Sequence, residues 1–361
     1  MSAVPPSLPL QTPAAVREAF AAARQDGLRA KDAAAAVGVS EGAAIAAHLG
    51  AYGHALHVRA LRGPWVELLQ GLAPCGELMA LTRNEAVVHE KTGPYLDVSG
   101  GGSIGLALGE RIDLRLFFDR WHAGFAVEEQ QGEGKPRLAS LQFYDRHGVA
   151  VHKVFQRAAS DQAAWAELVE RFAGGDTVPD FAPPAAPEVP RPDADIDVTG
   201  LRAAWQAMTD THQFFGLLKK FAVERQQALR LVEGRFSERL SSGSTRALLD
   251  AAVASGTAIM VFVGSPGCIQ IHTGAVARIV PMDRGEQRWL NVLDPGFNLH
   301  LREDMLAATW AVAKPTHDGR VTSVELFDHA GALMAMFFGA RKPGQPELQA
   351  WRELVAGLPR H

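Results

Sequence analysis

The pattern of hydrophobic and polar residues runs through the same order twice along the chain. Residues 26–48 and 201–231 have apolar positions at helical spacing and are rich in Ala, Leu, Arg and Gln, which favours helices. The segments that follow are short, apolar or alternating, and are separated by Gly, Pro and Asp, which predicts strands. Because these strands follow one another without intervening helices, the pattern predicts an α+β fold with antiparallel sheets and not a doubly wound parallel sheet. In the second half the strand-like segments are 259–263, 268–272, 289–293, 309–313 and 322–327.

The order recurs because the two halves of the sequence resemble each other at an offset of about 181 to 186 residues. Ser140 aligns with Ser323 in the strand region, and Trp165 aligns with Trp351 in the helix that closes each half. The alignment indicates that one ancestral unit was duplicated and fused. We expect two tandem homologous repeats, each a large antiparallel β-sheet with helices packed on one side.

A proline-rich segment separates the repeats. Six of the 21 prolines lie between residues 179 and 192, a density that sustains neither a helix nor a central strand. Such a segment is extended and semi-rigid, so it would hold the halves at a defined spacing. We therefore expect an N-terminal repeat over residues 1–177, a linker over 178–197 and a C-terminal repeat over 198–361.

Composition excludes several classes of protein. With 47% hydrophobic and 21% charged residues, the 361-residue chain can bury a sizeable core. Its 36 Lys and Arg against 40 Asp and Glu argue against a polyanion such as DNA as the main partner. Cys75 and Cys268 are too few for a disulfide framework or a cysteine zinc site. The N-terminal residues lack a signal-peptide pattern and no apolar run approaches the roughly 18 residues of a membrane span, which predicts a cytoplasmic protein without membrane insertion.

Two motifs suggest functions that their context does not support. Residues 100–105 fit the dinucleotide pattern G-x-G-x-x-G, but a strand-like segment follows where that pattern needs a helix, so we expect a hairpin or loop. Residues 29–47 resemble a helix-turn-helix, with Gly38 at the turn and Ser40 as the cap of the second helix. Because residues 1–60 contain five Lys and Arg and four Asp and Glu, we favour a structural helix pair and keep a DNA-binding regulator as an outside alternative.

Of the 13 histidines, His212 has the most suggestive surroundings. None of the histidines forms an H-E-x-x-H or a similar spaced metal cluster. Asp210 or Thr211 could cap a helix that begins beside His212, and the helix dipole would then favour a neutral imidazole that can bind iron. From the residues alone, the alternative that His212 is a histidine at a capped helix end with no iron-binding role remains open. The apolar neighbours are Phe214, Phe215, Leu217 and Leu218.

Several stretches of the second half carry a specific resemblance: residues 201–215, 260–264, 270–274, 289–304 and 314–319. With them the chain resembles the family of cytoplasmic haem-binding and haem-degrading proteins of bacterial haem uptake, the hemin-degrading factor or HemS/ChuS type. The resemblance covers nearly the whole chain, including the duplication.

The resemblance implies a set of site residues. His212 would be the single proximal ligand of the iron in haem b. Arg115 and Phe117 of the first repeat would cover the opposite axial face, so that the two repeats clamp haem between them. Arg115 cannot ligate iron, but its guanidinium can hold a water or oxygen by hydrogen bonds, which is the catalytic role that the resemblance assigns to it. The residues implied for the propionates and the apolar pocket are Arg225, Lys314, Arg341 and Phe262.

The function implied by the resemblance is haem trafficking, oxidative haem degradation with release of iron, or both. A degrading enzyme would need an external electron donor, because the sequence shows no flavin or nicotinamide site. A pure haem chaperone would use the same residues only for holding and release. The implied partners are haem, a haem ABC transporter, and a downstream haem oxygenase or reductase.

Overall fold

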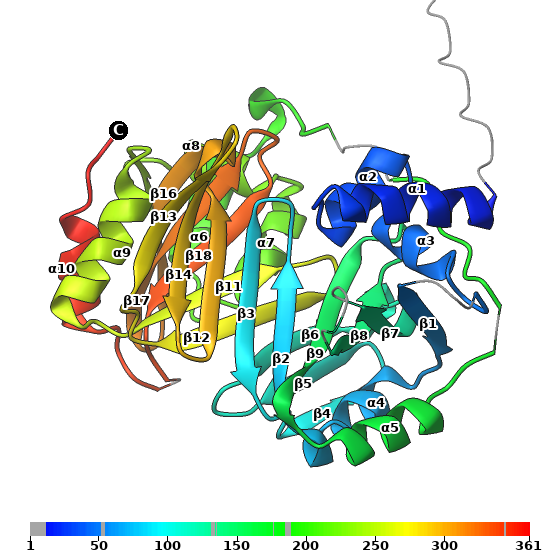
Figure 1. Cartoon of the computed structure of the whole chain (residues 1–361). Helices are drawn as coiled ribbons and strands as arrows, with labels where there is room; N and C mark the ends of the chain where they lie inside the picture. Colours follow the sequence, from blue (N-terminus) through cyan, green and yellow to red (C-terminus); the bar gives the residue numbers. More distant parts are fainter. Residues whose placement is uncertain are drawn as a thin grey trace, which may run out of the picture.

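The computed structural model describes residues 12–51, 55–130, 134, 136–175, 177–184, 189–342 and 344–361. Within these ranges the chain forms two nine-stranded antiparallel sheets, with helices arranged around them (Figure 1). The α+β class and the tandem duplication are thereby confirmed.

The first sheet is built mainly from the first repeat. Residues 56–59 at its edge alternate between buried and more exposed, as expected where one face meets the core, whereas residues 78–80 at its centre are buried in succession. In spatial order it contains β1 (Leu56–Leu61), β7 (Ala123–Gln130), β8 (Arg137–Tyr144), β9 (Ala150–Ser160), β2 (Gly76–Arg83), β3 (Val87–Gly93), β15 (Phe297–Arg302), β14 (Gln287–Asp294) and β13 (Ile279–Arg284).

The second sheet has the same plan and is built mainly from the second repeat. In spatial order it contains β10 (Ser237–Leu240), β16 (Leu306–Thr316), β17 (Gly319–Asp328), β18 (Leu333–Gly339), β11 (Ile259–Gly264), β12 (Cys268–Gly274), β6 (Asp113–Phe117), β5 (Ile104–Leu108) and β4 (Val98–Gly101).

Each sheet exchanges three strands with the other repeat. Strand β15 pairs with β3, with Leu299 opposite His89, and β6 pairs with β12, with Arg115 opposite Ile269. The sequence predicts strands in these places but not that they cross between repeats, because the pattern of one strand does not identify its neighbour. As a consequence, residues of the first repeat lie on the sheet of the second.

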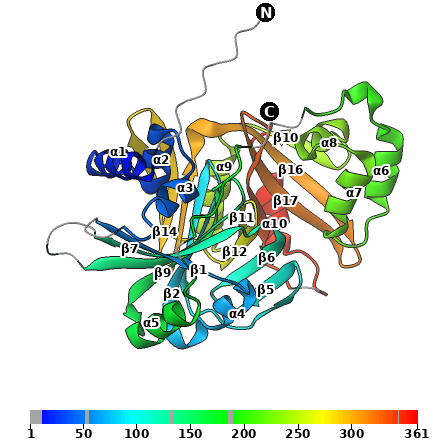
Figure 2. The same cartoon turned by 90° about the vertical axis from the view of Figure 1, so that its right-hand side faces the viewer.

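Helices lie on both sides of each sheet, although they leave part of the second sheet open, whereas the sequence pattern suggested one side only. Figure 2 shows α1–α3 and α5 on opposite sides of the first sheet. Both faces need cover because the central strands carry apolar side chains on both sides. The helices are α1 (Pro13–Gln25), α2 (Ala30–Val37), α3 (Glu41–Ala46), α4 (Trp65–Gln70), α5 (Gln162–Arg171), α6 (Val198–Gln206), α7 (Gln213–Phe221), α8 (Arg225–Leu231), α9 (Ser244–Ser255) and α10 (Gln349–Ala356).

In the described part of the chain, two clusters of the hydrophobic core contain residues of both sheets, and one of them includes α9. Val292 and Leu299 of the first sheet and Val261 and Phe337 of the second share a fully buried cluster with the inner face of α9. A separate cluster holds α6–α8 against β16 and β17, around Trp205 and Trp310. This separate cluster fixes the position of α7, which carries His212 at its start.

The two motifs set aside in the sequence have structural roles. Residues 100–105 form the β4–β5 hairpin, with Gly100 paired to Gly105, as predicted. The 29–47 segment forms the expected helix pair: Gly38 has a positive φ at the end of α2 and Ser40 caps α3. Five of the six residues of α3 are buried, so α3 has no free face to enter a DNA groove.

The proline-rich segment is attached to the first repeat through residues 180–183. Phe181 packs against the cluster under α1–α3, and the amide of Ala182 donates to the carbonyl of Arg146 at 2.8 Å. Pro187 and the rest of 185–188 lie outside the described residues.

None of the helices in the described part of the chain is long and apolar enough to cross a membrane.

Candidate functional site

Strand exchange brings the predicted residues of the two repeats onto one face of the second sheet. Paired residues of antiparallel strands point to the same side, and side chains alternate along each strand. Phe262 of β11 lies opposite Ile271 of β12, which lies opposite Asp113 of β6. Arg115 and Phe117 lie two and four residues further along β6, so they share the face with Phe262.

The same face continues to the strands that carry the predicted cations. Phe262 lies opposite Met336 of β18, and Met336 lies opposite Glu325 of β17. Lys314 of β16 contacts the carboxylate of Glu325. The six strands from β6 to β16 therefore place four of the seven predicted site residues on one surface, which α6–α8 cover only at its β16–β17 end.

His212 lies at the start of α7 with 90% of its side chain exposed. It is the N-cap residue itself, whereas the sequence suggested a cap at Asp210 or Thr211. The backbone N–H of His212 donates to Oδ1 of Asp210 at 2.7 Å, and Nδ1 of the ring lies 2.6 Å from the same oxygen. These two hydrogen bonds hold the pKa of Asp210 below its usual range. Among the described residues, Nε2 of His212 has no hydrogen-bond partner.

The apolar residues around His212 divide into two groups. Phe214, Leu217 and Leu218 are buried against α6 and the sheet, where Phe214 packs edge-on to Trp205. Phe215 is 77% exposed on the His212 side of the helix. The sequence predicted that all four apolar residues surround the imidazole. An amphipathic helix instead buries one apolar stripe and leaves only the residues on its other side at the surface.

Further apolar side chains are exposed on the sheet part of this face. Ile104 and Leu108 of β5 are 58% and 49% exposed and lie opposite Phe117 and Asp113. Phe262 packs edge-on to Phe338 with 5.0 Å between the ring centres. The open surface between α7 and the β5–β6 hairpin therefore combines aromatic and aliphatic groups with an exposed imidazole.

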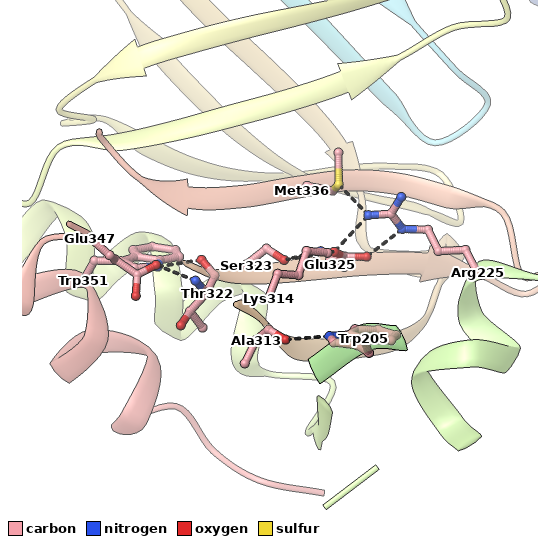
Figure 3. A network of polar contacts seen from close by, with 10 residues as sticks. All are labelled: Trp205, Arg225, Ala313, Lys314, Thr322, Ser323, Glu325, Met336, Glu347 and Trp351. Carbon is pink, nitrogen blue, oxygen red and sulfur yellow. Dashed lines mark hydrogen bonds and ion pairs between the residues drawn. The ribbon is translucent and has the colours of Figure 1, made fainter. Parts of the chain in front are cut away.

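Two of the three cations predicted to meet propionates share one buried carboxylate. Arg225, at the start of α8, binds Glu325 through Nε at 2.7 Å and Nη2 at 3.0 Å (Figure 3). Nζ of Lys314 lies 2.7 Å from Oε1 of Glu325 and 3.3 Å from Oγ of Ser323. Both cations also lie over the ring of Phe214, at 4.9 and 4.5 Å. The cluster therefore keeps one unbalanced positive charge.

Burial and charge oppose each other within this cluster. Burial alone would raise the pKa of Glu325, but the charges of Arg225 and Lys314 outweigh it and hold that pKa far below its usual range. Burial lowers the pKa of Lys314, an effect that the Glu325 carboxylate counteracts. A buried carboxylate between two cations is therefore fully ionised at neutral pH.

The remaining two predicted cations also have acidic neighbours. Arg115 donates to the carboxylate of Asp113, two residues before it on β6, and about a third of its side chain is exposed. Arg341, which follows β18, lies 3.5 Å from Asp318, and its Nη1 is buried without a partner among the described residues. The i, i+2 spacing of Asp113 and Arg115 was visible in the sequence, whereas the other partners are distant in sequence.

These features define a tandem-repeat α+β protein with an exposed histidine beside an apolar face and a buried cationic cluster. A family model described as "Haemin-degrading HemS.ChuX domain" matches residues 38–172 and 222–358, and the chain belongs to this family. The hemin transport protein HemS of Yersinia enterocolitica is 38% identical over 348 residues, which cover 95% of this chain and 97% of HemS.

Solved structures agree with this assignment. Holo-PhuS, a heme-binding protein from Pseudomonas aeruginosa, superposes with a TM-score of 0.91 at 46% identity, covering 97% of this chain and all of PhuS. ChuS, an E. coli heme oxygenase, superposes with a TM-score of 0.84 at 35% identity, covering 95% of this chain and 99% of ChuS.

Proposed function

We propose that the chain binds haem b on the open face between α7 and the β5–β6 hairpin, with Nε2 of His212 as the iron ligand. The observation that carries the proposal is the state of His212: its ring is exposed and Nδ1 is held by Asp210. A hydrogen bond at one ring nitrogen fixes the tautomer that leaves the other nitrogen as a neutral ligand. Similarity to the heme-binding protein PhuS supports haem as the bound molecule.

The rest of the face fits the chemistry of a flat, mostly apolar macrocycle with two carboxylates. Phe117 and Phe262, with the exposed Phe215, offer apolar surface to the ring. Arg225, Lys314 and Arg341 supply positive charge for the propionates, and the single excess charge at Glu325 would be balanced by one propionate. Arg115 would cover the second axial side, where its guanidinium can orient water or oxygen.

In this proposal the protein is cytoplasmic, accepts haem delivered by an ABC transporter, and carries it onward or degrades it. The repeats over 1–177 and 198–361, with the linker over 178–197, would act as the two sides of the clamp. As an enzyme it would take electrons from an external reductase, and as a carrier it would pass haem to a downstream oxygenase. A DNA-binding regulator through residues 29–47 is disfavoured by the burial of α3.

Hemin titration tests the binding proposal. The wild type is expected to give a saturable one-to-one Soret band, and His212→Ala a shifted or weakened band with a Kd at least 10-fold higher. His329→Ala removes another exposed histidine, from the β17–β18 turn, and serves as the matched control. His317→Ala tests the nearest alternative, because the His317 amide bonds to the Thr209 carbonyl beside α7. Coincident spectra for wild type and His212→Ala would move the ligand elsewhere.

A second experiment separates enzyme from carrier. The one-to-one complex is mixed with ascorbate in air, with catalase present because free peroxide destroys haem without an enzyme. Loss of the Soret band with release of iron would assign degradation to this chain. A stable band together with transfer of haem to an acceptor protein would assign carriage.

A further inference from the structure

The duplication places a cavity at the same position in each repeat, away from the His212 face. In the first repeat a cavity of about 550 Å³ lies between α5 and strands β1, β7 and β8. In the second repeat a cavity of about 480 Å³ lies between α10 and strands β10, β16 and β17, at the side of the molecule where α10 is seen in Figure 1. Neither lining includes a residue of the proposed haem site.

The strand registers show which residues of the two cavities correspond. On β7, Val127 pairs with Ser140 and Glu128 with Ala139. On β16, the residues opposite the aligned Ser323 and its predecessor Thr322 are Val312 and Ala313. Position 313 therefore corresponds to position 128, so the second repeat has a small apolar residue where the first has a carboxylate.

The lost carboxylate leaves a strand arginine unpaired in the second cavity. In the first repeat Arg137 donates to Glu128 at 3.2 Å. Arg320 holds the equivalent position, three residues before the aligned serine, and lines the second cavity. With Ala313 in place of the carboxylate, the guanidinium of Arg320 has no hydrogen-bond or ion-pair partner among the described residues.

The second cavity also gains an arginine on its helix. Arg352 follows Trp351, whereas the residue after the aligned Trp165 is Ala166. Among the described residues, Arg352 has a side-chain partner only at Nε, which donates to Glu347 at 3.2 Å. Both terminal nitrogens of Arg352 are therefore available as donors.

Two further arginines make the second cavity strongly cationic. Arg360 binds Glu238 at 2.8 Å and donates to the carbonyls of Val355 and Leu358, so it offsets the negative end of the α10 dipole. Arg235 lies over the ring of Phe236 at 5.2 Å. The lining thus holds four guanidinium groups against Glu238, and counting Glu347 still leaves two positive charges in excess.

We propose that the cavity beneath α10 is a binding site for a small polyvalent anion of the phosphate or polycarboxylate type. Two planar guanidinium groups with free donors, Arg320 and Arg352, match the paired oxygens of such an anion. The volume of the cavity is in the range of small-molecule sites. The first cavity, whose charges are paired through Arg59 with Glu170 and Arg137 with Glu128, does not select anions.

Calorimetric titration of the full-length protein at low ionic strength tests this site, with inorganic phosphate and citrate as the two probes. At least one of them is expected to bind the wild type at a single site. The double variant Arg320→Gln, Arg352→Gln is expected to bind it at least 10-fold more weakly, and Arg320→Lys to fall in between. Binding of phosphate alone or citrate alone identifies which oxyanion class the cavity selects.

The control is Arg59→Gln, Arg137→Gln, which removes one arginine from the lining of the first cavity and one that pairs with its Glu128, and is expected to bind the probe as the wild type does. An unchanged hemin titration of both double variants shows that they are folded and that the site is separate from the haem face. The proposal is overturned by absence of saturable binding of both probes, by equal binding to the Arg320, Arg352 variant, or by equal weakening in the first-cavity control.

Discussion

Asp210 holds the ring of His212 by accepting from both the backbone N–H and Nδ1 of that residue. The carboxylate thus fixes the side chain in orientation and in tautomer before any ligand arrives. A carboxylate in this position behind a metal-bound histidine makes the ring a better ligand.

Asp210→Ala is therefore expected to weaken hemin binding by about 10-fold while leaving the one-to-one stoichiometry unchanged. The Kd can be measured from hemin transfer to apomyoglobin. Asp283→Ala, which removes an exposed carboxylate from β13, should bind as the wild type does. Equal Kd values for Asp210→Ala and wild type would show that Asp210 does not act through the ligand.

Glu325 is the charge on which the cationic cluster depends. Glu325→Gln leaves Lys314 buried without its counter-ion, so the free energy of unfolding is expected to fall by about 3 kcal/mol. Urea denaturation monitored by tryptophan fluorescence measures the change. The double variant Glu325→Gln, Lys314→Met should recover part of the loss because it no longer buries an unpaired ammonium. A single variant as stable as the wild type would contradict the assigned ion pairs.

Arg115 is expected to affect the affinity of small ligands for the second axial side of the iron and not the affinity of the protein for haem. Arg115→Ala should retain the one-to-one hemin complex but bind azide at least 10-fold more weakly, because a charge-assisted hydrogen bond to the anion is lost. Arg120→Ala, an exposed arginine just beyond β6, is the control. Unchanged azide affinity in Arg115→Ala would place Arg115 away from the iron.

A buried histidine makes stability depend on pH. His152 contacts Thr82 at 2.9 Å and Tyr95 at 2.8 Å, and burial lowers the pKa of His152 to about 3. Above the unfolded pKa of about 6.5 the ring is neutral in both states. As the pH falls from about 6.5 towards 3, only the unfolded chain takes up the proton, so this residue makes stability decline by up to about 1.4 kcal/mol per pH unit.

His152→Gln should be less stable at pH 7 but lose stability less steeply below pH 6. The slope of its free energy of unfolding against pH should be smaller by the uptake of about one proton. Denaturant unfolding at a series of pH values measures this slope. His329→Gln, in which an exposed ring is replaced, is expected to keep the wild-type slope. Parallel slopes for His152→Gln and wild type would show that His152 is not the group responsible.

The fold class was predictable because it depends on local pattern, whereas the strand exchange was not. The apolar segments at 259–263 and 268–272 became β11 and β12, and the aligned tryptophans Trp165 and Trp351 lie in equivalent helices α5 and α10. Which strand lies beyond β12 depends on contacts between residues some 150 positions apart, such as Arg115 and Ile269. No local pattern encodes such a neighbour.

The sequence predicted the site residues that lie in recognisable motifs, but not the contacts that these residues make. The 201–215 segment indicated His212, but not that Nδ1 would be held by Asp210 or that Phe214 would face inwards. Likewise the cations were visible, while their partner Glu325 lies 100 residues from Arg225 along the chain. Charge partners that meet only through packing require the structure.

The crystal structure of the one-to-one hemin complex tests the central claim most directly. We predict iron bonded to Nε2 of His212, with Phe117 and Phe262 against the ring, Arg115 on the opposite axial side, and the propionates near Arg225, Lys314 and Arg341. Iron bonded to a different side chain, or hemin located in the cavity beneath α5 or α10, would contradict it.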